Sequence, residues 1–268
     1  MEQMQQLVGP HFEATADNWR ELYDREDIYA RLYQFRRHAV LQWVDSLALG
    51  AGTGVLEVGC GPGLTAVELA RRGHSVTAVD IAPAMIGMTR KLASQKGVSV
   101  RSLVGDIFSL PFPNDTFPLV LSIGVVEWIP APDVAIDRLA QVLAPAGHLI
   151  VTTDNQWSLN RLLDPALNPA LDPFKRFLRR REQKARPGVH SVWEFEAAIE
   201  NAGLQIVSRR TLGFGPFSLF KYPVMPDRFA IRLHRHLQRA ADRGLPLLRG
   251  AGHLHAVLAR KQHGAKPQ

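Results

Sequence analysis

A short glycine-rich stretch constrains the fold of this chain more than any other segment. Residues 55–58, Val-Leu-Glu-Val, are typical of a buried β-strand, and glycines follow at positions 59, 61 and 63. A periodic apolar segment from Thr65 to Arg71 then predicts a helix. Glycine permits a sharp bend and lets a ligand lie directly against the backbone. The stretch therefore predicts a strand, a turn and a helix N-terminus that cradle a nucleotide or cofactor.

The spacing of the glycines weakens the two standard phosphate-binding interpretations. A dinucleotide fingerprint reads G-x-G-x-x-G, but Leu64 stands where its third glycine belongs. A phosphate-binding loop ends in Gly-Lys-Ser/Thr, whereas this turn ends in Gly-Leu-Thr. What remains is an acid, Glu57, followed by G-x-G-x-G, and this pattern resembles motif I of the class I S-adenosylmethionine (SAM) methyltransferases. An unspecific tight turn is the alternative. The segments that follow in the chain must distinguish between the two interpretations.

The next segments fit the same interpretation. Residues 75–80 predict a second strand that ends in Asp80, about 20 residues after the first glycine, where an acid can accept hydrogen bonds from ribose hydroxyls. A role of Asp80 as a helix cap before Pro83 is the alternative. A helix over 83–95 and a third strand over 98–104 follow, and the strand is closed by Gly-Asp-Ile at 105–107.

Three further segments carry the resemblance through residue 154. Residues 110–124 are similar to the family segment L-P-F-x-x-x-x-F-D-x-V that leads into the fourth strand, with Pro118 in place of the usual Asp. A helix over 133–143, a Pro-containing turn over 144–147 and a strand over 148–153 follow in the family's order. The resemblance implies a cofactor site for SAM in which acids accept from ribose and adenine and aliphatic side chains flank the ring. These residues are Glu57, Gly59, Gly61, Gly63, Asp80, Ile81, Asp106, Ile107 and Ser122.

The implied architecture is an α/β fold, a doubly wound Rossmann-like sheet of seven strands with an antiparallel edge strand. Residues 204–211 and 253–260 predict the last two strands, an antiparallel pair at the sheet edge. We expect an N-terminal helical lid at 1–45 and a SAM-binding methyltransferase domain at 46–268. That domain holds two C-terminal insertions, a cap at 155–190 and an amphipathic segment at 213–250.

Charge is distributed unevenly along the chain. The net charge is +7, but residues 1–154 have a balance of −5 and residues 155–268 one of +12. Such asymmetry indicates contact with nucleic acid, an anionic membrane or an acidic substrate, with a solvated basic face as the alternative. The single cysteine, Cys60, excludes an internal disulfide. No apolar run reaches the ~20 residues of a spanning helix, and no signal core is present, so we expect a cytoplasmic protein, with a peripheral position at the inner face of a membrane left open.

The aromatic residues predict where an acceptor binds. Residues 11–45 carry them at helical spacing, which is typical of a core. Small-molecule methyltransferases place a helical lid over SAM and substrate, so the resemblance implies substrate contacts from this region as well. The candidates from the lid, the loop after the fourth strand and the second insertion are Tyr23, Tyr29, Tyr33, Trp128, Phe214 and Phe217.

The second insertion contains a basic amphipathic helix over 226–243. Its apolar residues, Phe229 and Leu233 among them, lie on one side, and five arginines lie largely opposite. Such a helix suits a membrane interface, with arginines on lipid phosphates. Packing of the apolar stripe onto the domain is the alternative, and the sequence leaves both open.

Transfer of a sulfonium methyl group to a hydroxyl requires alignment, exclusion of water and removal of a proton. Glu127 lies just past the fourth strand, at the edge where ligands bind in doubly wound sheets, and is the first candidate for the base. His190 is the second. A structural role is the alternative for each. The chain has no H-x-x-x-H or clustered-carboxylate pattern, so we predict no metal.

The class of acceptor follows from missing motifs. Enzymes that methylate exocyclic base amines carry an Asn/Asp/Ser-Pro-Pro-aromatic tetrad where this chain has Ser-Ile-Gly-Val at 122–125, and no second cysteine is present to attack C5 of a pyrimidine. Nucleic acid is therefore disfavoured. We expect methyl transfer to a hydroxyl of a lipophilic or aromatic small molecule. The alternatives are N- or C-methylation of a lipid, quinone or tetrapyrrole-type acceptor, methylation of RNA or protein, and SAM binding without catalysis at an anionic membrane.

Overall fold

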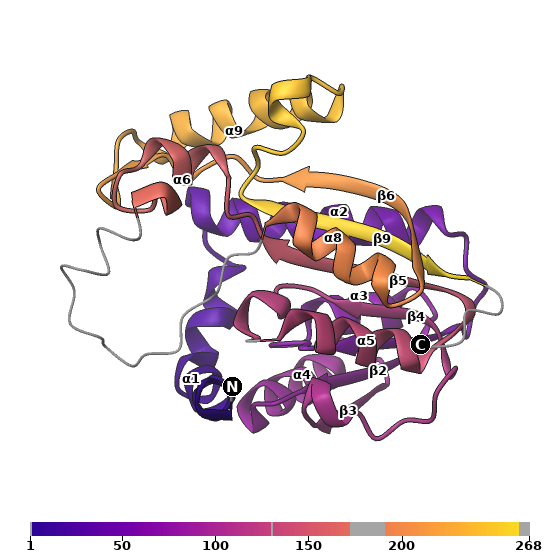
Figure 1. Ribbon diagram of the computed structural model, residues 1–268. Helices are drawn as coiled ribbons and strands as arrows, with labels where there is room; N and C mark the ends of the chain where they lie inside the picture. Colours follow the sequence, from indigo (N-terminus) through magenta and orange to yellow (C-terminus); the bar gives the residue numbers. More distant parts are fainter. Residues whose placement is uncertain (1, 130, 172–190, 263–268) are drawn as a thin grey trace.

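The computed structural model describes residues 2–129, 131–171 and 191–262, with side chains from residue 7 onward (Figure 1). A seven-stranded sheet lies between two layers of helices, as the sequence predicted. Its strands are β1 Gly54–Val58, β2 Ser75–Asp80, β3 Val100–Val104, β4 Phe117–Ser122, β5 Leu143–Asp154, β6 Leu204–Leu212 and β9 Leu254–Lys261.

The strand order is β3-β2-β1-β4-β5-β9-β6. Strands β1 to β5 pair in parallel, and β9 is antiparallel to both β5 and β6. The predicted antiparallel pair is present, but the edge position belongs to β6, and the antiparallel strand lies one place further in. The direction of β9 has a geometric reason. The insertion after β6 ends at the carboxyl edge of the sheet, so β9 starts at that edge and runs antiparallel to its neighbours.

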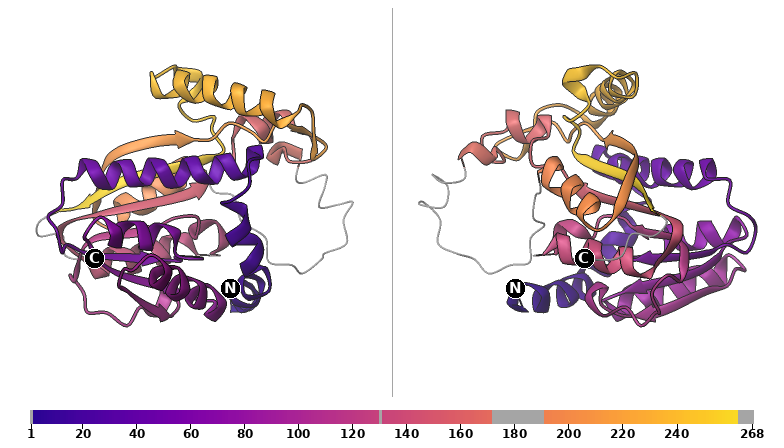
Figure 2. Two further views of the ribbon diagram at one scale, coloured as in Figure 1. Left: turned by 180° about the vertical axis from the view of Figure 1, so that it is seen from behind. Right: turned by 45° about the vertical axis from the view of Figure 1, so that its right-hand side comes forward.

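Helices cover both faces of the sheet (Figure 2). One face packs against α5 Pro132–Val142 and α8 Val192–Asn201, and the other against α2 Ile28–Ser46, α3 Leu64–Arg71 and α4 Pro83–Gln95. Helix α1 Glu2–Leu22 packs outside α4, where Ala16 meets Met85. Burial on both faces explains why the central strands are nearly continuous apolar runs rather than alternating ones.

The predicted lid divides into two parts with different surroundings. Val40, Leu41 and Val44 of α2 are buried in the core against β1, β4 and α3. The second half of α2 is therefore a core helix. Only α1 and the first half of α2 are placed to cover a ligand, so the lid that we propose is shorter than residues 1–45.

Pro118 produces a local irregularity. The register between β4 and β5 shifts between Phe117 and Leu119. Proline has no N–H to contribute to a ladder, so a shift at this point avoids an unmet hydrogen bond. The family's segment tolerates the substitution because it falls at the start of the strand.

Short elements fill the two insertions and the connecting loops. At the carboxyl edge, β5 leads into α6 Leu159–Leu163 and β6 leads into a small hairpin and α9 (Figure 1). These elements are η1 Ile107–Ser109, η2 Val126–Trp128, η3 Pro169–Leu171, β7 Ser218–Leu219, β8 Tyr222–Pro223, α9 Asp227–Asp242 and η4 Pro246–Leu248.

Helix α9 packs on the domain through only part of its apolar stripe. Its buried residues are Ala230, His234, Gln238 and Ala241. Phe229 and Leu233, which the sequence placed on the packing side, are 47% and 37% exposed. The stripe is therefore divided: its members Ala230 and Ala241 contact the domain beside the polar His234 and Gln238, whereas Phe229 and Leu233 do not, and both interpretations left open by the sequence remain.

Candidate functional site

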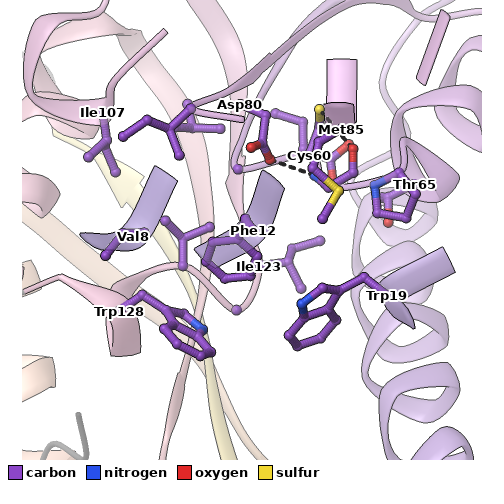
Figure 3. Close-up of a pocket in the computed structure, with 18 of the residues that line it drawn as sticks. Val8, Phe12, Trp19, Cys60, Thr65, Asp80, Met85, Ile107, Ile123 and Trp128 are labelled. Atoms are coloured by element: carbon purple, nitrogen blue, oxygen red, sulfur yellow. Dashed lines mark hydrogen bonds between the residues drawn. The ribbon is translucent and has the colours of Figure 1, made fainter. Parts of the chain in front are cut away.

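A pocket opens at the carboxyl ends of β1, β2 and β4, beneath α1 (Figure 3). In this view Asp80 and Cys60 lie on one side, and Trp19 and Trp128 lie on the other with Phe12 between them. A doubly wound sheet places ligands at this edge because the strand order reverses between β1 and β4. The main lining residues are Val8, Phe12, Trp19, Tyr23, Arg36, Arg37, Glu57, Gly59, Cys60, Gly61, Asp80, Ile81, Asp106, Ile107, Trp128 and Ile129.

The three glycines of the turn serve different purposes. A Cβ on Gly59 would lie 2.1 Å from Val125 Cγ2, and one on Gly63 would lie 2.5 Å from Thr89 Oγ1. Packing by itself therefore requires glycine at both positions, because a Cβ would overlap these neighbours. Gly61 has φ +53° and no neighbour within 4 Å of a Cβ, yet it lines the pocket. Its missing side chain leaves the backbone open to a ligand, which is the property expected of a cofactor turn.

Asp80 joins the end of β2 to this turn. Its Oδ2 accepts a hydrogen bond from the Gly61 N–H at 2.8 Å, and its Oδ1 accepts one from the Ala82 N–H at 3.0 Å. Burial raises the pKa of Asp80, while these hydrogen bonds oppose the increase. A carboxylate has about four acceptor positions, so both oxygens can still accept from a ligand hydroxyl.

The other predicted cofactor residues occupy two kinds of position. Ile81, Asp106 and Ile107 line the pocket at the ends of β2 and β3, and Asp106 Oδ1 accepts from the Phe108 N–H at 3.0 Å. Gly63 is the N-cap of α3 and faces Thr89 rather than the pocket. Ser122 is fully buried at the end of β4 and also lies outside the lining.

Two arginines that the sequence reasoning missed line the pocket beside Glu57. Arg36 Nε and Nη1, Arg37 Nε and Glu57 Oε2 are buried and have no hydrogen-bond partner within the described residues. Burial raises the pKa of Glu57 to about 8, and the nearby Arg37 opposes the increase. The sequence carries no distinctive signal for them, because other polar residues of α2 lie around them and burial is not visible in the sequence.

The unpaired groups fit the amino-acid end of SAM. Buried polar atoms are nearly always paired, so a pocket with orphaned donors and acceptors is matched to a polar ligand. Glu57 and a ligand ammonium group would satisfy each other, as would the guanidinium groups of Arg36 or Arg37 and a ligand carboxylate. Together with Asp80 and the turn, the pocket carries complementary groups for both the ribose and the methionine part of that cofactor.

The opposite wall of the pocket is aromatic. Phe12 of α1 lies edge-on to Trp128 with ring centroids 4.9 Å apart, and His11 stacks on Trp128 at 5.1 Å. Trp19 contacts both Phe12, at 5.8 Å, and Tyr33, at 5.7 Å. Aromatic side chains bury large apolar areas and hold defined geometries, so this wall suits a flat or lipophilic molecule.

Glu127 is buried next to the pocket without lining it. Its Oε1 lies 3.8 Å from Arg36 Nη1, both side chains are 5% exposed, and its Oε2 has no partner within the described residues. Burial raises the pKa of Glu127, the charge of Asp154 adds to the increase, and Arg36 opposes it. A carboxyl group with a raised pKa beside a pocket is a candidate for proton transfer. His190, the second candidate, lies outside the described residues.

The predicted substrate residues divide into three groups. Tyr23 and Trp128 line the pocket. Tyr33 is half-buried outside the lining, and its ring lies under the Arg36 guanidinium at 4.7 Å. The remaining three are not brought to the pocket: Tyr29 is 47% exposed, Phe214 is buried with its N–H donated to His234, and Phe217 packs against the cluster of Ile28, Leu32 and Ala230.

The Cys60 thiol is a small buried filler in the turn. Burial raises its pKa well above the ordinary value, with the charge of Asp80 as the next cause, so the thiol stays protonated. Its Sγ lies 3.6 Å from both the Gly61 carbonyl oxygen and Thr89 Oγ1. A neutral buried thiol is a poor nucleophile, so a role in covalent catalysis is disfavoured. In the described part of the chain, no three or more His, Cys, Asp or Glu residues gather into a group that could hold a metal ion.

Comparison with known proteins agrees with this geometry. Residues 56–151 match the family model described as "Methyltransferase domain". The ubiquinone biosynthesis O-methyltransferase of Pseudomonas putida (strain GB-1) is 28% identical over 217 residues, which cover 77% of this chain and 86% of that protein. The enzyme of the same name from Pseudomonas paraeruginosa (strain DSM 24068 / PA7) is 31% identical over 147 residues, or 54% of this chain. That match spans 61% of the relative's length.

Solved structures confirm the fold over nearly the whole chain. Magnesium protoporphyrin IX methyltransferase from Synechocystis PCC 6803 with bound SAH has a TM-score of 0.68 at 17% identity and covers 96% of this chain and 100% of its own. The [4+2]-cyclase SpnF has a TM-score of 0.63 at 19% identity, with 96% of each chain covered. At such identities the likeness concerns the fold alone. From the family match, the relatives and the motif I pocket together, residues 56–151 of this chain form a methyltransferase domain of the class I SAM-dependent type.

Proposed function

We propose that this protein transfers the methyl group of SAM to a hydroxyl group of a lipophilic or aromatic small molecule. One observation carries the proposal: a single pocket has the glycine turn and Asp80 on one wall and Phe12, Trp19 and Trp128 on the other. A cofactor wall that faces an aromatic wall brings a methyl donor and an apolar acceptor into contact and keeps water out.

SAM supplies a methyl group that is already activated for displacement. The remaining work falls to the residues of this chain. Phe12 and Trp128 would hold the acceptor ring in line. Glu127, in its carboxylate form behind the lining, would take the hydroxyl proton through one water as the new O–C bond forms and the S–C bond breaks. Arg36, at 3.8 Å, favours the carboxylate form and would keep its orientation fixed.

The relatives support an oxygen acceptor. The Pseudomonas proteins are named as O-methyltransferases of ubiquinone biosynthesis, and the match to the one from Pseudomonas putida covers 77% of this chain and 86% of that protein. The aromatic wall of this pocket is consistent with a phenol-like acceptor. The expectation of a cytoplasmic location stays a prediction. Within the part of the chain that the structure describes, we find no helix that is long and apolar enough to cross a membrane.

Calorimetric titration of the purified protein with SAM and, separately, with NADH tests the cofactor first. We expect micromolar binding of SAM and none of NADH. Labelled methyl transfer from SAM to lipid-soluble extracts, and to simple catechols and phenols, then tests the acceptor class. Formation of base-stable methyl ethers supports the proposal, whereas label in amines, carboxyl esters or macromolecules contradicts it.

A further inference from the structure

Apolar side chains gather on the surface of the second insertion. The hairpin β7–β8, the helix α9 and η4 are consecutive, and they lie at the end of the molecule opposite β3 and α4 (Figure 1). Tyr222 is 77% exposed and Leu247 is 87% exposed. We call this set the insertion surface; its exposed large apolar residues are Leu219, Phe220, Tyr222, Val224, Phe229, Leu233, Leu245 and Leu247. So many exposed apolar residues in 29 positions mark an interaction site.

Phe229 and Leu233 of α9 face outward because the helix is attached through other residues, which are two small alanines and two polar side chains. Gln238 Oε1 accepts from the Gly213 N–H at 2.9 Å, and Gln238 Nε2 donates to the Thr211 carbonyl oxygen at 3.0 Å. His234 Nδ1 accepts from the Phe214 N–H at 3.1 Å. Surface helices normally bury their apolar stripe. This helix is anchored without using Phe229 and Leu233, so both remain available to a partner.

The hairpin is also a firmly held element. The carboxylate of Asp164, which is fully buried, accepts from Ser218 Oγ at 2.6 Å and from the Lys221 N–H at 2.9 Å. Asn160 Oδ1 accepts from the Ser218 N–H at 3.1 Å. At the tip, Phe220 and Lys221 have φ of +50° and +70°. Left-handed backbone at two consecutive residues other than glycine is unfavourable, so the fold holds an aromatic and a basic side chain at the tip against this cost.

The charge around the insertion surface is strongly positive. Lys221 stands at the hairpin tip, and the exposed arginines of the insertion are Arg228, Arg232, Arg235, Arg239, Arg243 and Arg249. The two acids of α9 are already engaged: Asp227 accepts from the Ile28 N–H and Asp242 pairs with Arg210 at 2.9 Å. Aromatic and aliphatic tips flanked by arginines match an anionic lipid interface, in which the apolar side chains enter the acyl boundary and the arginines contact phosphates.

We propose that the insertion surface docks this protein on an anionic lipid bilayer. The hairpin follows the carboxyl end of β6, and the pocket lies at the carboxyl ends of β1, β2 and β4, so both lie along one edge of the sheet. Docking would thus bring the catalytic edge toward the membrane, where a lipophilic acceptor dissolves. Only this last step rests on the proposed function; the docking itself does not.

Vesicle cosedimentation tests the docking. Wild-type protein is mixed with phosphatidylcholine vesicles and with vesicles of phosphatidylcholine and phosphatidylglycerol at 3:1. We expect binding to the anionic vesicles that weakens at high salt. The double variants Phe220→Ser/Tyr222→Ser and Arg232→Glu/Arg239→Glu should each bind at least about tenfold more weakly. Circular dichroism and SAM calorimetry should show both variants folded and with unchanged affinity for SAM.

Matched controls lie on other faces of the molecule. Trp193→Ser removes an aromatic residue that is 80% exposed on α8, and Lys91→Glu/Arg101→Glu reverses two exposed charges on α4 and β3. Both should bind vesicles like wild type. Equal loss in the controls and the test variants, or binding that ignores lipid charge, overturns the proposal. So does a wild-type dimer that the Phe220→Ser/Tyr222→Ser variant converts to a monomer with vesicle binding unchanged, because the surface then joins two copies of the chain.

Discussion

Arg36 Nη1 lies 3.8 Å from Glu127 Oε1, and both side chains are 5% exposed. This buried pair connects the first half of α2 to the loop after β4, and Arg36 also lines the pocket. Truncation of one member of such a pair leaves an uncompensated buried charge, so Arg36→Ala would unfold or weaken the protein rather than report on chemistry. Isosteric neutralisation of Glu127 is the more informative change.

Glu127→Gln should lower kcat by about 10²-fold or more and leave the affinity for SAM within about twofold, because it removes the base and keeps the shape. Steady-state kinetics with a phenolic acceptor and calorimetry with SAM measure the two effects. Glu194→Gln, at an exposed position on α8, is the control and should match wild type. A Glu127→Gln enzyme with normal kcat would show that another group, or water, accepts the proton.

The pH dependence of catalysis follows from the same carboxyl group. Burial raises the pKa of Glu127, and the base acts only when it is deprotonated. The rate should therefore rise as the pH increases through the neutral and mildly alkaline range, to a plateau above the raised pKa. The rising limb should be missing from the residual activity of Glu127→Gln. A flat wild-type profile from pH 6 to 9 would contradict the assignment.

The free energy of unfolding should fall as the pH rises, whereas the catalytic rate should increase. Burial raises the pKa of Glu57 to about 8 from an ordinary value of 4.5, so the folded state holds a proton that the unfolded state releases. Stability is then full below pH 4.5 and falls as the pH rises toward 8, by up to about 1.4 kcal/mol per pH unit for this one group. Thermal unfolding of SAM-free protein at several pH values should show the fall, and Glu57→Gln should flatten it. An unchanged slope in that variant would contradict the buried neutral state of Glu57.

Substitutions in and near the glycine turn can separate an effect on SAM binding from an effect on stability. Gly61→Val and Asp80→Ala should each weaken SAM binding by at least about tenfold, because one fills the space next to the exposed backbone and the other removes the acceptor of the ribose hydroxyls. Gly87→Ala on α4 is the control: its Cβ meets nothing within 4 Å and helix propensity favours Ala, so stability should rise slightly with SAM binding unchanged. Retained SAM affinity in both test variants would remove the cofactor assignment.

The aromatic wall should determine the affinity for the acceptor rather than the affinity for the cofactor. Trp128→Ala removes a ring that stacks on His11 and meets Phe12 edge-on, so the KM for a lipophilic acceptor should increase about tenfold or more. The dissociation constant of SAM should change much less. Trp193→Ala removes an exposed tryptophan and should alter neither value. An equal loss of acceptor and SAM affinity in Trp128→Ala would mean that the wall belongs to the cofactor site.

The sequence predicted the central fold well because its signals are local. Strand β2 and helix α4 have the bounds that the sequence indicated, since their apolar periodicity and their punctuation by Gly73, Pro83 and Gly97 all agree. The cofactor turn and Asp80 could be found because a fixed spacing along the chain places them together. The relation between Gly61 and Asp80 needs only one strand-turn-helix unit and the neighbouring strand.

Features that depend on long-range packing could not be predicted in this way. The aromatic residues of the second insertion looked like substrate contacts, but Phe214 is buried between β6 and α9, where its own N–H is bonded to His234. The two polar anchors of α9, Gln238 and His234, were missed because only the backbone of residues 211–214 reveals their partners. Arg36 was overlooked because its importance arises from Glu127, 91 positions further along the chain.

The position of β9 has a consequence for how the molecule assembles. It follows every other strand of this sheet along the chain, yet it lies between β5 and β6 and pairs with both. Until the ribosome has made residues 254–261, the sheet has a gap, and β6 has no strand to join. Pairing across this distance is entropically costly and slow. Completion of the sheet therefore depends on a strand that is made after both of its neighbours, and a nascent chain stalled before it would expose the bare edge of β5 to aggregation or to chaperones.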